Sequence, residues 1–112
     1  MARLIAWMLF GCALPVVAHG ADTNTDNHKA AQRLAASCAG CHGTAGVVVG
    51  NSLPPLAGQS SAAIIASMQA FKSGSRPSTL MQQLAKGYTD EQVALIAAYF
   101  SGLKVEPAGG AK

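Results

Sequence analysis

Two cysteines and a histidine near the middle of the chain have types and spacing that can do chemistry. Cys38 and Cys41 are separated by two small residues, and His42 follows directly. This C-x-x-C-H pattern is the attachment motif of c-type haem. Two thiols at this spacing can add to vinyl groups on neighbouring edges of one porphyrin, which brings the following imidazole beneath the iron. The pattern therefore predicts one covalent haem c, with Cys38 and Cys41 as thioethers and His42 as an axial iron ligand.

Three other uses of the same side chains compete with haem attachment. A thioredoxin-like redox pair is expected beside a βαβ pattern, and none surrounds this motif. A zinc site takes about four ligands, but beyond residue 20 the chain has only these two cysteines and two histidines, one of them His28. A structural disulfide would close a very short loop and add little stability. The residues favour haem over these alternatives.

A methionine is the candidate for the second axial ligand. Beyond the N-terminal segment the chain has only Met68 and Met81. Met68 shares the apolar face of a predicted helix with Ile64 and Phe71, which indicates a core role. Met81 follows a proline-containing linker, 39 residues after His42, so the chain is long enough to reach the other face of the ring. Met81 is the predicted axial thioether, with a core role as the alternative, and soft sulfur would raise the reduction potential.

The histidine ligand should donate its second ring N–H to an acceptor that fixes the orientation of the ring. Pro54 lies 12 residues after His42, in a Pro-Pro-Leu-Ala-Gly segment. Proline has no N–H, but its carbonyl is free to accept a hydrogen bond. We therefore expect the Pro54 carbonyl to accept a hydrogen bond from His42. The alternative is that this proline only interrupts regular secondary structure in the loop.

The first 20 residues have the layout of a secretory signal peptide. A short positive start precedes a mostly apolar run over residues 4–17, and small residues follow at the positions that a signal peptidase reads. Cleavage is expected between Gly20 and Ala21. The run is too short to span a bilayer comfortably, because spanning takes about 20 apolar residues. No stable membrane span is expected after cleavage.

Export would place the two thiols of the motif in the periplasm, an oxidising compartment suited to haem attachment. A minor alternative is a lipoprotein with its lipid on Cys12, because residues 9–12 weakly resemble a lipoprotein cleavage box. The phenylalanine at position 10 is atypical of such a box. The periplasm is the predicted location.

Residues 21–112 are expected to form a single monohaem domain with an ordered core at about 26–103. This part carries seven Lys or Arg against five Asp or Glu, a balance too mild to indicate nucleic-acid binding. Its aromatic side chains are few, and a domain of this size has little core of its own. A bulky apolar cofactor would supply the missing interior.

The pattern of apolar residues and caps predicts an all-α domain. A first helix is expected from about Asp26 to Ser37, capped by Thr25 or Asp26. Irregular chain is expected from Cys38 to Gln59, where glycine and proline are frequent. A second helix is expected from Ser60 or Ser61 to Ser73, and Gly74 would end it. A short helix is expected from Ser78 to Lys86. The last helix is expected to begin at a Thr89–Gln92 capping box and to end at Ser101, with an apolar face formed by Val93, Ile96, Ala97 and Phe100.

Taken together, these residues resemble class I cytochromes c over the whole predicted domain. The resemblance implies the cytochrome c fold, with three main helices, a short helix and long loops around one haem. It also implies that the first and last helices cross near the haem edge. Ala30 and Leu34 would then meet Ile96 and Tyr99. The family's Pro-x-Leu spacing falls on residues 54–56, and its methionine ligand falls on a later methionine.

A narrower resemblance lies in residues 71–81 and 85–91. These segments are similar to the cytochrome subunit of flavocytochrome c sulfide dehydrogenase, in which a haem subunit sits on an FAD-bearing subunit that oxidises sulfide. The resemblance implies an FAD-containing partner and Met81 as ligand. Cytochromes of the c4 and c553 kinds share much of this pattern. The chain has one C-x-x-C-H, whereas some family members carry two haem domains.

The predicted function is electron transfer, without catalysis by this chain. The leading hypothesis is acceptance of electrons from a flavoprotein sulfide dehydrogenase subunit. The alternative is a free c4/c553-like carrier that delivers electrons to a terminal oxidase or reductase. A peroxidase or gas-binding haem, which needs an open iron site, is disfavoured by Met81. A thiol–disulfide redox protein is the remaining alternative.

Overall fold

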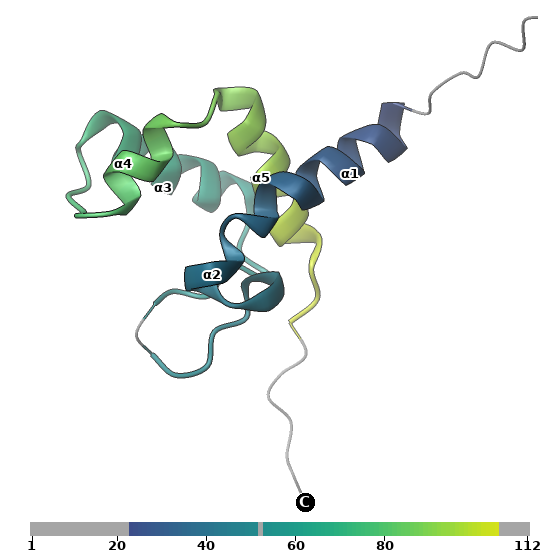
Figure 1. Ribbon diagram of the computed structural model, residues 1–112, viewed down its shortest axis with the longest axis horizontal. Helices are drawn as coiled ribbons and strands as arrows, with labels where there is room; N and C mark the ends of the chain where they lie inside the picture. The colour runs from purple at the N-terminus through teal and green to yellow at the C-terminus, as the bar shows by residue number, and fades with distance from the viewer. Residues whose placement is uncertain (1–22, 52, 106–112) are drawn as a thin grey trace, which may run out of the picture.

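The computed structural model describes residues 23–51 and 53–105, and this part of the chain is helical, without strands. The prediction of an all-α domain with three main helices is confirmed. The predicted signal peptide, its cleavage point and Cys12 lie outside the described residues. Figure 1 shows the elements, which are α1 (Thr23–Ala36), α2 (Ala39–His42), the 3₁₀ turn η1 (Thr44–Gly46), α3 (Ser61–Ser73), α4 (Met81–Lys86) and α5 (Asp90–Gly102).

The N-terminal helix begins earlier than expected, and its predicted cap is wrong. Helix α1 starts at Thr23, so Thr25 and Asp26 lie within its first turn. The expected start rested on Thr25 or Asp26 as the cap, whereas the exposed first turn of α1 has no apolar periodicity to mark where the helix begins. A carboxylate at Asp26 still favours this end, because it interacts with the positive end of the helix dipole.

The predicted caps of the later helices are confirmed. Ser60 Oγ accepts a hydrogen bond from the Ala63 N–H at 3.2 Å and starts α3. Gly74 ends that helix in the left-handed conformation, with φ 82° and ψ 2°. Thr89 and Gln92 form a reciprocal capping box at the start of α5. These caps satisfy N–H and C=O groups that have no partner inside the helix.

Helices α1 and α5 pack directly on each other, as the family resemblance implied. The α1 residues buried in the fold are Ala31 and Ala35, with 4% and 3% of their surfaces exposed. Ala30 and Leu34, the residues expected at this crossing, are only half-buried. The buried face is therefore rotated by one residue from the expected one. Small alanine side chains allow the two helix backbones to approach closely.

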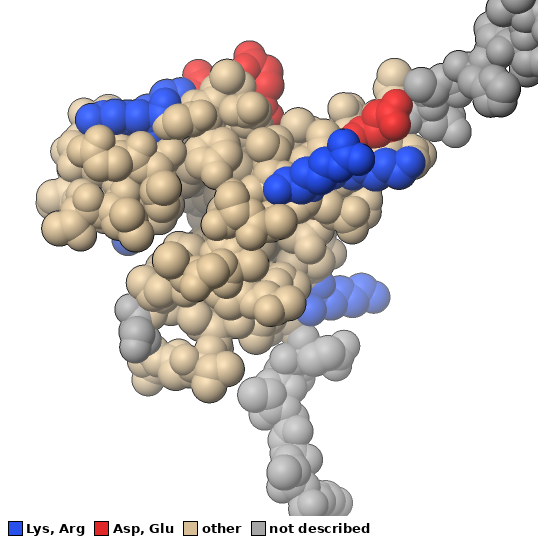
Figure 2. All heavy atoms as spheres, in the orientation of Figure 1, with Lys and Arg blue, Asp and Glu red and all other residues tan. Residues whose placement is uncertain are grey.

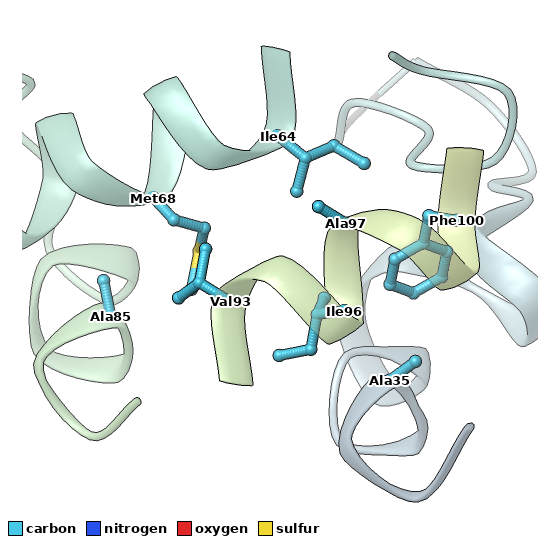
Figure 3. Close-up of a cluster of buried hydrophobic side chains, with 8 residues drawn as sticks. All are labelled: Ala35, Ile64, Met68, Ala85, Val93, Ile96, Ala97 and Phe100. Atoms are coloured by element: carbon cyan, nitrogen blue, oxygen red, sulfur yellow. The ribbon is translucent and has the colours of Figure 1, made fainter. Parts of the chain in front are cut away.

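The core lies where α3, α4 and α5 meet the end of α1 (Figure 3). Met68 of α3 is buried in this cluster and its side chain reaches Val93 of α5, which confirms its predicted core role. Phe100 is the one large side chain of the described residues with less than 2% exposure. Burying such a ring contributes about 1.5–3 kcal/mol. The other members are Ala35, Ile64, Ala85, Ile96 and Ala97.

Helix α4 begins at Met81, three residues later than expected. Within residues 23–51 and 53–105, no helix is long and apolar enough to cross a bilayer.

Candidate functional site

The two thiols and the histidine of the C-x-x-C-H motif lie on one tight turn. Helix α1 ends at Ala36, and the Cys38 carbonyl then accepts hydrogen bonds from the N–H groups of Cys41 (3.2 Å) and His42 (2.9 Å). The expected irregular chain thus contains a short helix, α2, at its start. On a helical turn, residues three apart lie on the same side. Cys38 and Cys41 therefore lie along one side of the turn, and His42 follows at its end.

His42 is the one buried polar side chain among the described residues, with 8% of its surface exposed. Its Nδ1 lies 2.9 Å from the Pro54 carbonyl oxygen. A carbonyl only accepts, so Nδ1 carries the hydrogen, and in the neutral ring the lone pair is on Nε2. A neutral imidazole with a free Nε2 is the form that ligates a metal. The structure thus brings His42 and the Pro54 carbonyl together, as the sequence predicted.

Gly46 positions the segment that carries this carbonyl, and the sequence did not single it out. The Gly46 carbonyl accepts hydrogen bonds from the N–H groups of Leu56 (2.9 Å) and Ala57 (3.2 Å). Because Gly46 is tied to the turn that bears His42, these bonds hold Pro54 beside the imidazole. Gly46 has φ +74°, a conformation that glycine adopts without strain. A glycine four residues after the histidine was the signal that could have revealed this position.

The two cysteines differ in their surroundings. Cys38 is half-buried and packs against the core, whereas Cys41 is exposed. Burial raises the pKa of the Cys38 thiol, and a hydrogen bond with Ser37 offsets part of that effect. Reactive redox cysteines instead have a lowered pKa, because the thiolate is the nucleophile. The surroundings of Cys38 therefore favour a neutral thiol packed against the core over a reactive thiolate.

Met81 is the first residue of α4. Its N–H donates to Ser78 Oγ at 3.1 Å, and its half-buried side chain packs against the core cluster. Helix α4 itself packs on α3. The hydrogen bond to Ser78 thus fixes the Met81 backbone at the start of α4.

A hollow separates the part of the molecule that carries His42 from the part that carries Met81. Figure 2 shows a notch between the surface over α3 and α4 and the surface over α2 and its following loop. A separate open pocket of about 460 Å³ lies within this loop and is lined by loop residues alone, among them Pro54. Large hydrophobic side chains are exposed in both segments that flank the notch: Val47, Val49 and Leu53 in the loop, and Leu80 and Leu84 around α4.

These features fit a haem c. Two thiols and an oriented imidazole share one turn, a thioether lies in the opposite segment, and apolar side chains in both segments could cover a flat macrocycle. Among residues 23–51 and 53–105, no cluster of three or more His, Cys, Asp or Glu side chains is arranged to hold a bare metal ion.

Comparison with known proteins identifies the family of the chain. Residues 25–100 match the family described as "Cytochrome C oxidase, cbb3-type, subunit III". Over 73 residues the chain is 49% identical to the cytochrome subunit of sulfide dehydrogenase from Chlorobaculum tepidum, which covers 62% of this chain and 63% of that protein.

Two further relatives are, by name, an electron acceptor and a cytochrome. The chain is 38% identical over 81 residues to a thiosulfate dehydrogenase electron acceptor of Stutzerimonas stutzeri, covering 70% of this chain and 38% of that protein. It is 40% identical over 68 residues to cytochrome c-554(548) of Halomonas halodenitrificans, covering 58% of this chain and 82% of that protein. The chain thus spans less than two thirds of the first two relatives.

The match to the family model covers more than half of the chain. A haem protein needs a turn that carries the cysteines, an oriented imidazole and an apolar surface, and this chain has all three. The chain belongs to the cbb3-type subunit III family of class I c-type cytochromes, a family of electron carriers with covalent haem c.

Proposed function

We propose that this chain accepts electrons from an FAD-containing sulfide dehydrogenase subunit. The observation that carries the electron-transfer site is His42, which is buried and held through Nδ1 by the Pro54 carbonyl. The identity of 49% to a cytochrome subunit of sulfide dehydrogenase supports the choice of partner. In this proposal Cys38 and Cys41 attach the haem, and His42 and Met81 are the axial ligands.

When bound, the haem supplies a one-electron couple between ferric and ferrous iron. The protein supplies the rest. The hydrogen bond from His42 Nδ1 to the Pro54 carbonyl fixes the orientation of the imidazole. The Met81 thioether is a soft donor, which favours the reduced state. Both donors lie on packed elements, so little rearrangement accompanies the change in charge. Oxidation of sulfide to the level of sulfur releases two electrons, so two copies of this chain are reduced per sulfide.

The domain boundaries and the cellular location belong to the same proposal. Residues 1–20 act as a signal peptide that is cleaved before Ala21, and residues 21–112 form one monohaem domain in the periplasm. The apolar run and the small residues at 18–20 support export. The thiols of residues 38 and 41 then meet haem in an oxidising compartment.

The surface around the attachment turn indicates the kind of contact that the partner makes. From Leu34 to Phe71 the sequence has no Asp, Glu, Lys or Arg. Figure 2 shows that the visible surface over α2 and its loop is uncharged, whereas the charged side chains lie over other parts of the molecule. Steering by opposite charges speeds encounters between charged faces. Here the partner would dock through apolar and neutral polar contacts, independently of salt.

The test is reduction of the purified ferric cytochrome by candidate donors. A sulfide dehydrogenase flavoprotein subunit is mixed with sulfide and the cytochrome, and the ferrous spectrum is followed. Fast reduction of two cytochromes per sulfide, together with co-purification of the FAD protein, is the expected result. The same assay without the flavoprotein measures direct reduction by sulfide.

A free carrier that serves a terminal oxidase or reductase is the second candidate. Similarity over 82% of the length of cytochrome c-554(548) supports it. In that case reduction by the flavoprotein subunit would be no faster than reduction by sulfide alone, and no FAD protein would co-purify. A thiosulfate dehydrogenase serves as a third donor in the assay, because a relative is named as its electron acceptor.

A further inference from the structure

Tyr88 lies between α4 and α5 and is held from several sides. Its N–H donates to the Ala85 carbonyl at 3.3 Å, and its own carbonyl accepts a hydrogen bond from Lys72 Nζ at 2.9 Å. The same ammonium group forms an ion pair with Asp90 at 3.0 Å. The half-buried ring packs against the core cluster. The backbone and ring of Tyr88 are therefore fixed, and its hydroxyl has a defined position.

That hydroxyl lies 2.6 Å from Ser37 Oγ, next to the first haem-attaching cysteine. Ser37 has one hydroxyl hydrogen, which it donates to the Leu34 carbonyl at 2.7 Å. When that hydrogen is on the Leu34 carbonyl, the Tyr88 hydroxyl is the donor to Ser37. Once Cys38 carries a thioether, its sulfur has no hydrogen to give, so the Tyr88 hydroxyl remains the donor to Ser37 Oγ.

This hydrogen bond joins two parts of the described chain that otherwise meet only through apolar packing in the core cluster. Helix α4, which begins with Met81, makes its main helix contact with α3. Among the hydrogen bonds within the described part of the chain, the Ser37–Tyr88 bond is the one that joins residues 23–42 to residues 78–89. It thus links the segment that carries the cysteines to the segment that carries Met81.

We infer that the Ser37–Tyr88 hydrogen bond is a latch that holds the Met81 segment in register with the attachment turn. Tyr88 is a positioning residue: it acts through the backbone that joins it to α4 and so favours the arrangement in which Met81 stays on the iron. This inference rests on the proposed ligation by Met81. Loss of the latch increases the fraction of molecules in which the thioether has left.

The test measures that fraction in the ferric holoprotein with added imidazole as the probe. Imidazole binds where Met81 has left, so its apparent affinity rises in proportion to the released fraction. Tyr88→Phe and Ser37→Ala are each expected to raise that affinity about 2- to 12-fold, the range for one hydrogen bond. The far-red absorption band of sulfur-ligated ferric haem should weaken in parallel. The double variant should resemble each single one, because both remove the same bond.

Tyr99→Phe is the matched control. Tyr99 lies on α5 with its ring edge-on to Phe100, and none of the hydrogen bonds found in the described part of the chain uses its hydroxyl. Its imidazole affinity should equal that of the unmodified protein. Unfolding in denaturant is measured for every variant. A lower unfolding midpoint with unchanged imidazole affinity would mean that the bond is merely structural, and would overturn the latch.

Met81→Ala separates the latch from the proposed ligand. If this variant binds imidazole about ten-fold tighter or more while Tyr88→Phe does not change, Met81 is a ligand and the latch is wrong. If Met81→Ala binds imidazole like the unmodified protein, the ligand assignment is overturned, and the latch with it. Tighter imidazole binding in both Met81→Ala and Tyr88→Phe, with unchanged binding in Tyr99→Phe, would support the latch.

Discussion

Gly46 lies directly against the ring of Phe100. A Cβ atom at position 46 would come within 2.8 Å of Phe100 Cδ1 and also of the Ala57 nitrogen. Phe100 is itself 1% exposed, so its ring cannot move aside without disturbing the core. The C-terminal helix and the turn after His42 are thus fitted to each other at a position where only hydrogen is tolerated.

Gly46→Ala is expected to destabilise the holoprotein by about 2–4 kcal/mol, from left-handed backbone strain and overpacking of the core. Gly50→Ala is the matched control, because Gly50 also has a positive φ (86°) but a Cβ atom added there would meet no other atom within 4 Å. That control should lose only about 1 kcal/mol. Denaturant unfolding followed by circular dichroism measures both. Equal losses in the two variants would contradict the close fit to Phe100.

Met81→Ala should leave the haem attached, lower the reduction potential and let carbon monoxide bind the ferrous protein at neutral pH. The reason is that the iron loses a soft ligand and gains an open position. Redox titration and absorption spectra measure these effects. Met68→Leu is the control, since it nearly conserves volume in the core and should cost less than about 1.5 kcal/mol while leaving the potential unchanged. A Met81→Ala protein with the original potential would exclude Met81 as ligand.

Thr89→Ala should cost about 1 kcal/mol, because it removes the side chain that accepts the Gln92 N–H at 3.2 Å. The loss should depend on pH. The pKa of Glu91 is lowered from 4.5 by its backbone N–H and then by the Thr89 side chain. Charged Glu91 therefore stabilises the fold above its ordinary pKa, and this contribution disappears as pH falls through the lowered value.

Unfolding measured at neutral and acidic pH tests this account. Thr89→Ala should narrow the difference in stability between the two pH values, because one cause of the lowered pKa is gone. Glu91→Gln keeps the cap but cannot titrate, so it separates the two effects. An unaltered pH dependence in Thr89→Ala would show that the cap does not act on Glu91.

Electron transfer with the protein partner should be insensitive to ionic strength, since the surface around the attachment turn has no charge to screen. Val49→Glu places a carboxylate there on a residue whose side chain is 100% exposed, so packing within the protein part of the fold should be unaffected. This variant should react several-fold more slowly and acquire a salt dependence. Lys29→Ala changes the charge on exposed α1 and should leave the rate unchanged. Stopped-flow reduction at several salt concentrations makes the comparison, and equal rates for Val49→Glu would place docking elsewhere.

Local sequence signals predicted much of this fold. Ser60, Gly74 and the Thr89–Gln92 pair act through groups within a few residues of themselves, so their roles can be read from the neighbouring sequence. The apolar spacing of α5 was strong enough to predict its buried face. The core position of Met68 followed from the same periodicity.

The missed features depend on contacts between distant residues. Ala31, rather than Ala30, faces the core because α1 is rotated to meet α5, and alanine occupies both positions with nothing local to distinguish them. The start of α1 has no apolar pattern. Gly46 and Phe100 are 54 residues apart, and Ser37 and Tyr88 are 51 apart, so neither pair is visible before the chain is folded.

The acceptor for His42 Nδ1 is a main-chain oxygen, and this makes the site robust to mutation. Every amino acid has the same carbonyl, so substitution of Pro54 changes the shape of the loop but cannot delete the acceptor. A side-chain acceptor could be lost by a single nucleotide change. Sequence drift in this loop can therefore proceed while the histidine keeps its hydrogen bond, and loss of the bond requires a change in the path of the backbone.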